Sequence, residues 1–270
     1  MNFKYLIKRY NLFELIKLTI IELHTKKYKK HFNDNPLWIE NSNVSKANVN
    51  LVIYTVIFGN YDDIQEPEFY GESIEYYIIT DQELSEDSRW KKYDYFKWES
   101  RLQGMSNIQK NRFFKMNAHL VFADYKYSVY VDGNVRIKDN PWKLVNRIGT
   151  SGVAVYRHKK RFCVYDEALF YEINRNIKDV KIHAFIKKLK KEKMPKGYGL
   201  LQCSIIYRDH ENSICRKVME QWWNCFCNSC DRDQLSLPYI LYKNSLSTME
   251  FDGLGNDFSK SEIYYTISHK

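Results

Sequence analysis

The stretch Tyr127-Ser-Val-Tyr-Val-Asp-Gly-Asn134 decides the fold that we expect for this chain. Its valines alternate with serine and tyrosine, which predicts a central β-strand, and Gly133 is expected to let the backbone turn sharply where the strand ends. Ligands bind at the carboxyl ends of the strands in open α/β sheets. We therefore expect Asp132 and Asn134 to emerge together at a ligand-binding edge.

Asp132 and Asn134 place two oxygen-bearing side chains across one tight turn, and such a pair can share a divalent cation, Mg²⁺ or Mn²⁺. A cation held there would neutralise the charge of a diphosphate. The alternative is a strand that simply ends in an Asp-Gly turn, which is common in proteins of any function.

The composition favours one large α/β domain with appendages. A chain of 270 residues can bury a sizeable core but is short for two domains with linkers. Its hydrophobic content of 44%, with 16% aromatic residues, excludes a disordered chain. The net charge of +9 indicates anionic partners, which could be phosphates, nucleotides, nucleic acid or an anionic membrane.

The chain has no run of eighteen apolar residues and no signal peptide, so we expect a cytoplasmic protein with reduced cysteines. Cys225, Cys227 and Cys230 nevertheless lie close together in the sequence. A structural zinc site would need a fourth ligand, for example Cys215, and the spacing does not match paired Cys-x-x-Cys motifs. Whether this cluster binds metal stays open.

Residues 1–48 are expected to form a basic amphipathic helix and a linker, ahead of an α/β domain at 49–270. Apolar side chains recur at helical spacing between Phe3 and Leu23. Residues 1–30 carry eight basic and two acidic side chains, a net charge of +6. Such a helix either lies on an anionic membrane surface or packs on the domain with a solvated basic face.

Apolar runs and helical periodicity predict alternating strands and helices in the remainder of the chain. Strands are expected at 51–58, 76–80, 92–98, 153–156 and 200–207, and helices at 107–122, 163–193, 211–226 and 231–242, with a short helix that begins at 139–142.

With these elements in order, the chain resembles a glycosyltransferase family of the mucilage-related type, formerly a domain of unknown function, with members in bacterial polysaccharide clusters. The resemblance covers roughly residues 50–240 and depends on these stretches: Val52-Ile-Tyr-Thr-Val-Ile-Phe-Gly-Asn-Tyr-Asp62, Ile79-Thr-Asp81, Asn111-Arg-Phe-Phe-Lys-Met-Asn-Ala-His119, Ser128-Val-Tyr-Val-Asp-Gly-Asn134, His158-Lys-Lys-Arg161, Gly199-Leu200, Trp222-Trp223 and Arg232-Asp-Gln234. It implies a single GT-A-like, Rossmann-related α/β domain with a mixed central sheet flanked by helices, in addition to the amino-terminal helix. It also implies sugar transfer from a nucleotide sugar, usually with a divalent cation.

The resemblance implies a role for each motif. The loop after the first strand would hold the base and ribose through Thr55, Phe58, Gly59, Tyr61 and Asp62. Asp81 would bond the ribose or base, unless it only caps a helix. Arg112 and Lys115 share a helical face and would reach the diphosphate, unless they are ordinary surface charges. Asp132 and Asn134 would hold Mg²⁺ or Mn²⁺.

Two later motifs each have more than one interpretation. His158 and Arg161 would supply a metal ligand or a phosphate contact, although a histidine in a basic turn is more often a surface residue. Asp233 and Gln234 open a helix, where aspartate is also a common cap. We expect Asp233 to contact the donor or acceptor sugar and to act as catalytic base if the reaction inverts stereochemistry, which the sequence does not determine.

Two departures from the family pattern bear on the chemistry. Gln202 stands where we expect an acidic residue, so an acid cannot be assumed there. Asn134 replaces aspartate in the second metal position and should weaken metal affinity.

The expected function is metal-assisted transfer of a hexose from a nucleotide sugar, expected to be UDP-linked. The acceptor would be a glycan or lipid-linked glycan in capsule or O-antigen synthesis, with residues 1–30 on the inner face of the cell membrane. The alternative is a non-enzymatic basic module that binds nucleic acid or an anionic membrane, although we expect no nucleic acid partner because the excess charge is concentrated in one appendage. A third interpretation, a nucleotidyltransferase, lacks support in the sequence, because no Gly-rich basic loop that would bind a triphosphate follows the first strand.

Overall fold

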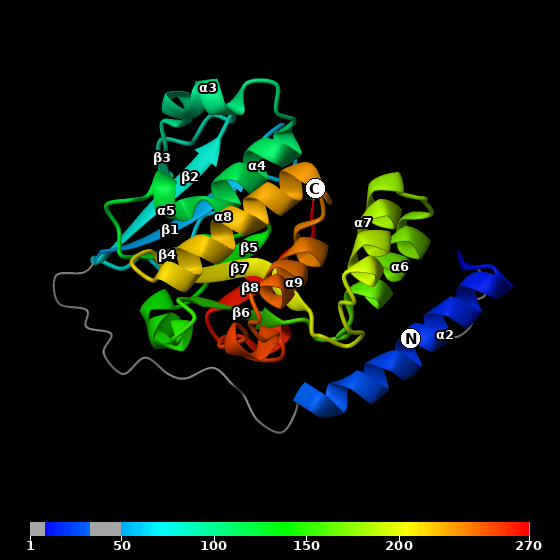
Figure 1. The fold of residues 1–270 in the computed structure, drawn as a ribbon. Coiled ribbons are helices and arrows are strands. Elements are labelled where there is room, and N and C mark those ends of the chain that lie inside the picture. Colours follow the sequence, from blue (N-terminus) through cyan, green and yellow to red (C-terminus); the bar gives the residue numbers. More distant parts are fainter. Residues whose placement is uncertain (1–8, 33–49, 270) are drawn as a thin grey trace.

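A six-stranded mixed sheet forms the centre of the molecule in this computed structural model, which describes residues 9–32 and 50–269 (Figure 1). The strand order is β3 (Lys91–Lys92), β2 (Ile74–Thr80), β1 (Leu51–Ile57), β4 (Tyr127–Val131), β7 (Leu201–Asp209) and β6 (Val153–Arg157). β7 runs antiparallel to both of its neighbours, and the strands from β3 to β4 are parallel to one another. The predicted α/β domain with a mixed central sheet is confirmed.

β1 and β4 are buried along their whole length because the sheet is covered on both faces. Val52, Tyr54 and Val56 of β1 point into one core, and Leu51 and Ile53 point into the other, as the alternation of side chains along a strand requires. The parallel register of β1 with β2 and β4 brings their carboxyl ends to one edge of the sheet. This is the edge at which the sequence predicts a binding site.

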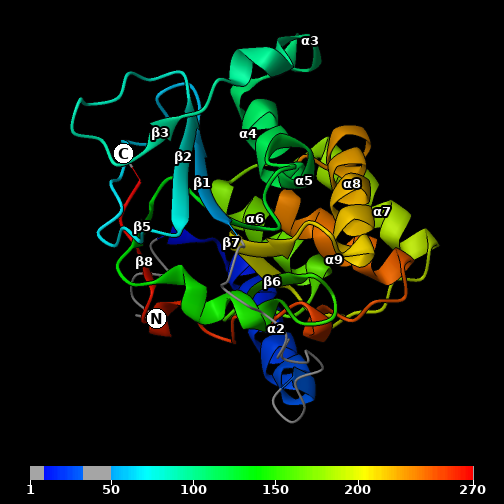
Figure 2. The ribbon, with the colours of Figure 1, turned by 90° about the vertical axis from the view of Figure 1, so that its left-hand side faces the viewer.

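Helices cover one face of the sheet, and a small antiparallel pair of strands covers the other (Figure 2). The first face carries α3 (Glu99–Leu102), α4 (Asn107–Met116), α5 (Ala118–Val121), α8 (Ser213–Asn228) and α9 (Asp233–Lys243). The second carries β5 (Val135–Ile137), β8 (Tyr264–Thr266) and the 3-10 helices η3 (Pro141–Ile148) and η5 (Phe258–Lys260). α6 (Val164–Arg175) and α7 (Val180–Lys191) extend the first core to the side, and η4 (Thr248–Glu250) follows α9.

Three predicted elements differ from the structure. The predicted strand at 92–98 overlaps β3 only at Lys92. Asp94 accepts a hydrogen bond from the Phe96 amide and caps the 3-10 helix η2 (Tyr95–Trp98), so the strand ends before it. The predicted helix at 163–193 is two helices, since Asn176 adopts a left-handed conformation (φ 51°) that ends α6. The predicted helix at 107–122 is interrupted at Asn117, whose ψ of 34° is not helical.

The amino-terminal segment contains helix α2 (Leu12–Lys29) and the short 3-10 helix η1 (Lys30–Phe32). Asn11 and Glu14 form a capping box that fixes the start of α2. The helix lies along α6, at the margin of the molecule (Figure 1). Residues 1–8 and almost all of the predicted linker lie outside the described residues. Among the helices of the described part of the chain, none is long and apolar enough to cross a membrane.

Candidate functional site

A cavity of about 330 Å³ opens near the carboxyl end of β4 and contains six of the residues predicted for the site. Those six come from α4, the turn after β4, the end of β6 and the start of α9: Arg112, Lys115, Asp132, His158, Asp233 and Gln234. Gln202, Cys203, Ser204 and Arg232 complete the wall. The fold therefore gathers residues that are separated by up to 122 positions in the sequence.

Lys115 is the central charge of this cavity. Its side chain is buried, and its ammonium group lies 2.8 Å from Asp233 Oδ2 and 3.3 Å from Asp132 Oδ1. Arg112, one turn earlier on α4, places Nε 3.1 Å from the same Asp233 oxygen. The prediction that Arg112 and Lys115 share a helical face is confirmed, and both face the cavity rather than open solvent.

Asp233 is held as a carboxylate. Burial favours its neutral form, but the charges of Arg112 and Lys115 outweigh burial and hold the pKa of Asp233 well below its ordinary value. Its position in the first turn of α9 also favours negative charge, and the indole of Trp222 donates to its carbonyl oxygen at 3.1 Å. A carboxylate with such a low pKa is a weak proton acceptor.

Asp132 stands at the boundary between the protein interior and the cavity. Tyr130 donates a hydrogen bond to Oδ1 at 2.8 Å, the same oxygen that Lys115 contacts, and about one third of the Asp132 side chain is exposed. The Val135 amide donates to the Asp132 carbonyl at 2.9 Å and closes the turn. Gly133 does not adopt positive φ, so the sharp turn predicted from the sequence does not explain a glycine here. Lack of space explains it instead, because a Cβ atom would lie 3.0 Å from Ile57 and 3.3 Å from an oxygen of Asp62.

A second polar cluster adjoins this turn and includes His269, which sequence reasoning missed. His269 Nδ1 lies 2.9 Å from the buried carboxylate of Asp62, and the Asn134 amide lies 3.3 Å from Nε2. Because a carboxylate only accepts, Nδ1 carries the proton and Nε2 keeps its lone pair. His269 belongs to no sequence motif, so its neighbours become apparent only in the fold.

The sequence as a whole matches a known family. The sequence model described as "TOD1/MUCI70, glycosyltransferase-like domain" matches residues 6–256. The chain belongs to this family. The match extends over α2, well beyond the 50–240 covered by the motifs.

Three of the solved structures that the chain resembles are distant from it in sequence. Mouse xyloside xylosyltransferase 1 is 10% identical, with a TM-score of 0.43 over 75% of this chain and 84% of that chain. The bifunctional glycosyltransferase WbbM is 12% identical, with a TM-score of 0.39 over 82% of this chain and 39% of that chain. The galactosyltransferase LgtC is 12% identical, with a TM-score of 0.37 over 76% of this chain and 72% of that chain. No curated protein sequence matches the chain.

His158 lines the cavity just after β6, and the nearby Lys160 carbonyl contacts α2. The amides of Lys160 and Arg161 lie 3.2 and 2.9 Å from His158 Nδ1 and donate to it, so this nitrogen is not free for a ligand. Burial, together with the charges of Arg161 and Lys160, lowers the pKa of His158 to about 3. Arg161 itself pairs with the buried Glu167 and stacks on Phe170, outside the cavity wall.

The residues predicted to hold the nucleotide lie at the ends of β1 and β2. Gly59 has φ of 68°, and its amide donates to both oxygens of Asp81, at 3.1 and 3.0 Å, so Asp81 ties the two strand ends together instead of capping a helix. Tyr61 is exposed, and Phe58 and Thr55 are buried. The Thr55 hydroxyl lacks a hydrogen-bond partner within the described part of the protein. These residues and Asp62 do not line the cavity around Lys115.

The donors available to a divalent cation fit one that is shared with a diphosphate. Asp132 offers a carboxylate whose protein contacts both use Oδ1. Asn134 offers an amide oxygen, while its nitrogen contacts His269 Nε2 and the Ile267 carbonyl. Residues 9–32 and 50–269 hold no group of three His, Cys, Asp or Glu side chains placed to bind a metal. Mg²⁺ is commonly held by one or two carboxylates together with substrate phosphates.

The cysteine cluster consists of free thiols, of which Cys225 and Cys230 are buried.

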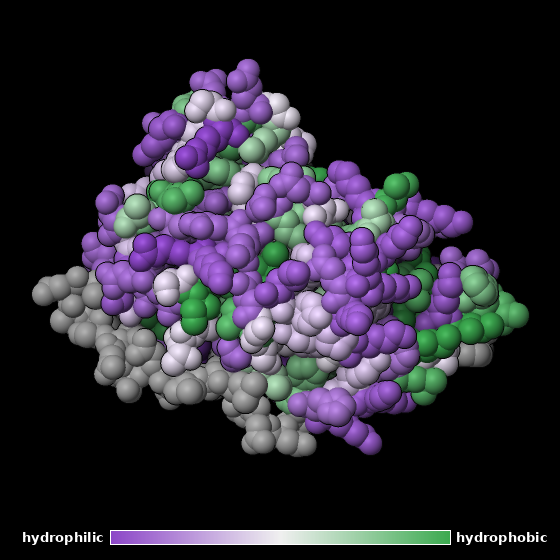
Figure 3. Space-filling model, viewed as in Figure 1, coloured by the Kyte–Doolittle hydropathy of each residue, from purple (hydrophilic) through white to green (hydrophobic). Residues whose placement is uncertain are grey.

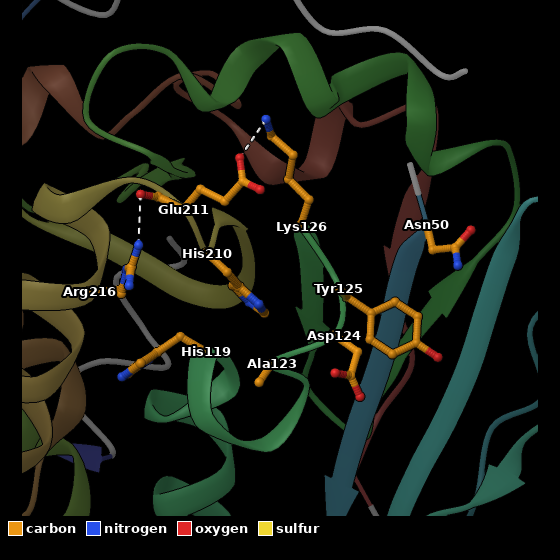
Figure 4. Close-up of a pocket in the computed structure, with 9 residues that line it drawn as sticks. All are labelled: Asn50, His119, Ala123, Asp124, Tyr125, Lys126, His210, Glu211 and Arg216. Carbon is orange, nitrogen blue, oxygen red and sulfur yellow. Dashed lines mark hydrogen bonds and ion pairs between the residues drawn. The ribbon is translucent and has the colours of Figure 1, made fainter. Parts of the chain in front are cut away.

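A second cavity, of about 500 Å³, lies at the opposite edge of the sheet (Figure 4). His119, His210 and Arg216 line one side, and Asn50, Asp124 and Tyr125 line the other. Lys126 and Glu211 form an ion pair of 2.8 Å at its rim. None of the predicted site residues lines this cavity, whereas six of them line the cavity around Lys115.

Proposed function

We propose that this protein transfers a hexose from a UDP-sugar to a glycan or lipid-linked glycan during synthesis of a bacterial surface polysaccharide, in the cytoplasm. The observation that carries the proposal is the buried Lys115, which joins Asp132 at the carboxyl end of β4 to Asp233 at the start of α9. In a member of a glycosyltransferase-like family, this arrangement supports a site for a phosphorylated sugar donor.

The charges in the cavity indicate how much positive charge a bound diphosphate would still require. Arg112 and Lys115 are balanced by Asp132 and Asp233, so these four side chains together are neutral. A diphosphate entering the cavity would need additional positive charge. Arg232 lines the same cavity, and its guanidinium lies 4.0 Å from a carboxylate oxygen of Glu167. Arg232 and a divalent cation would together provide that charge.

We propose that Asp132 and Asn134 would hold this Mg²⁺ or Mn²⁺ cation. When bound, the cation stabilises the negative charge that develops on the departing nucleotide. Asp62 keeps the proton of His269 on Nδ1, and Nε2 accepts from the Asn134 amide, so His269 orients the Asn134 side chain. The sequence-based assignment of His158 as a ligand or catalytic group stays a prediction. In the structure Nδ1 accepts from two backbone amides, and Nε2 lies 3.2 Å from a guanidinium nitrogen of Arg161.

Asp233 is suited to binding sugar hydroxyls. Its two contacts to Arg112 and Lys115 fix the carboxylate, which can still accept hydrogen bonds from a sugar. Its low pKa argues against its use as a general base. Gln202 and Gln234 lie in the same wall and can contribute neutral hydrogen bonds to the donor or acceptor.

The proposal is tested by nucleotide release from UDP-, GDP- and CMP-sugars, with Mn²⁺, with Mg²⁺ and with a chelator. The proposed function requires that one donor is hydrolysed in a metal-dependent manner and that Asp132→Asn lowers the rate at least about a hundredfold. Asp87→Asn, at an exposed aspartate outside both cavities, is the matched control and should keep the parent rate. Failure to bind or cleave any donor would favour the non-enzymatic basic module.

A further inference from the structure

One face of helix α2 is apolar and uncovered by the described part of the protein. Leu12, Phe13 and Leu23 are 75%, 66% and 59% exposed, and Ile16 and Ile20 between them are also exposed. Leu12, Ile16, Ile20 and Leu23 are spaced by three or four residues and therefore form one stripe along the helix. Exposed apolar side chains gathered on one helix face mark an interaction surface.

The opposite face of α2 is fixed to the domain. Ile21 and Tyr28 are buried, His24 Nδ1 lies 2.9 Å from Asp166 of α6, and the Thr25 hydroxyl donates to the Lys160 carbonyl at 2.9 Å. Arg9 binds the end of α6 at Asn174. The stripe is therefore presented outward by a helix that is already docked.

Positive charge gathers at one end of the stripe. Lys26, Lys27, Lys29 and Lys30 are exposed at the carboxyl end of α2, and Lys17 lies over the ring of Phe13 at 4.3 Å. Residues 9–32 carry six basic and two acidic side chains. Figure 3 shows hydrophobic and hydrophilic side chains side by side along the edge where α2 lies. An apolar helix face bordered by lysines is complementary to an anionic bilayer surface.

The docked helix is linked to the wall of the cavity around Lys115 through Lys160. Thr25 bonds the carbonyl of Lys160, and the amide of Lys160 donates to His158, which lines that cavity. A surface that binds the outer face of α2 would thus lie close to the cavity. This position suits an acceptor carried on a lipid, a point that rests on the proposed function.

We propose that the outward face of α2 inserts into the interface of an anionic lipid bilayer and holds the protein there as a peripheral protein. The apolar stripe enters the boundary between headgroups and acyl chains, and the lysines contact anionic headgroups. Sugar transfer is not needed for this docking, so the two proposals can fail separately.

The test is flotation of the full-length protein with vesicles of phosphatidylcholine alone or mixed with phosphatidylglycerol. We expect binding to the mixed vesicles and at least about tenfold weaker binding of the double variant Phe13→Ser, Leu23→Ser. Phe96→Ser with Ile108→Ser, at side chains 66% and 62% exposed on other elements, is the matched control and should bind as the parent does. Lys26→Gln with Lys27→Gln should reduce the preference for anionic vesicles.

Three results would overturn the proposal: no binding to either vesicle, equal binding by the stripe variant, or self-association in light scattering that the stripe variant abolishes. The last result would identify a second copy of the chain as the occupant. The stripe variant should also keep the parent circular dichroism spectrum and donor hydrolysis without vesicles. Loss of vesicle binding with hydrolysis retained would then report on the surface alone.

Discussion

Lys115 contacts both carboxylates of the cavity, and its positive charge offsets the repulsion between them. Asp132 and Asp233 come from elements about a hundred residues apart, and the single ammonium group contacts both. A buried cation without its anions, or the anions without the cation, would be strongly unfavourable. The arrangement is therefore a unit in which each member depends on the others.

Replacement of Lys115 by methionine tests this dependence. We expect the free energy of unfolding to fall by about 3–5 kcal/mol, because Asp132 and Asp233 would lose their shared partner. Adding Asp233→Asn to Lys115→Met should recover part of that loss, which a double-mutant cycle in urea denaturation would measure. Lys110→Met, on the same helix, is the control and should change stability by less than about 1 kcal/mol. A simple sum of the two single effects would argue against coupling.

The lowered pKa of Asp233 predicts how the free energy of unfolding depends on pH. Its pKa is lowered in the folded protein, so its ionisation adds stability at neutral pH that is lost as pH falls below the ordinary aspartate pKa of about 4 and on through the folded pKa. The parent should therefore be more stable than Asp233→Asn at pH 7, and the difference should shrink only below about pH 4. Denaturation curves between neutral and acid pH would check this. A difference that grew on acidification would contradict the sign.

At the level of elements, strands and long helices were predictable where apolar residues form unbroken patterns. β1, β4 and α9 lie within two residues of their predicted positions. The breaks inside predicted helices were missed, because they depend on single residues such as Asn117 and Asn176 within an otherwise helical pattern. β3 was overestimated because aromatic residues suit both a strand and the 3-10 helix that follows it.

Asn176 ends α6 in a left-handed conformation, so substitution by glycine should affect stability oppositely at Asn176 and at Asn224. Asn176→Gly should raise the free energy of unfolding by a few tenths to about 1 kcal/mol, because glycine adopts positive φ without strain. Asn224→Gly, inside α8, should lower it by about 0.5–1 kcal/mol, because glycine is unfavourable within a helix. Urea denaturation of both variants would measure the signs. Destabilisation of similar size at both positions would refute the role of Asn176 as a helix stop.

For the whole molecule, burial of neutral histidines predicts acid sensitivity. Burial, with the charges of Arg208 and His119, lowers the pKa of His210 to about 3, whereas an unfolded histidine titrates near about 6.5. Between these values the unfolded chain binds more protons, so His210 contributes a loss of stability as pH falls. The slope is at most about 1.4 kcal/mol per pH unit for each such imidazole, and His158 contributes in the same direction.

His210→Gln should reduce this slope between about pH 6.5 and pH 3, measured as the free energy of unfolding in urea. His31→Gln, at an exposed position, is the matched control and should leave the slope near that of the parent. Asp252 acts oppositely, since burial raises its pKa to about 6 despite its pair with Arg157. Comparison of variants with the parent separates these contributions. An unchanged slope in His210→Gln would contradict the assignment.

The candidate site was predictable in part because parallel strands place their carboxyl ends together. That rule located Asp132, and helical spacing placed Arg112 and Lys115 on one face. It could not reveal that Lys115 bridges Asp132 and Asp233, because α9 approaches α4 only in the folded chain. His269 was missed for the same reason, since its contacts with Asp62 and Asn134 join the two ends of the domain.

A crystal structure with a bound nucleotide sugar tests the central claim most directly. The account predicts that the diphosphate lies in the cavity around Lys115, within hydrogen-bond distance of Arg112 or Arg232, with any divalent cation on Asp132. Asp233 should contact a hydroxyl of the donor sugar. A nucleotide bound instead in the cavity lined by His119 and His210, or a diphosphate that leaves the Lys115 cluster untouched, would contradict the account.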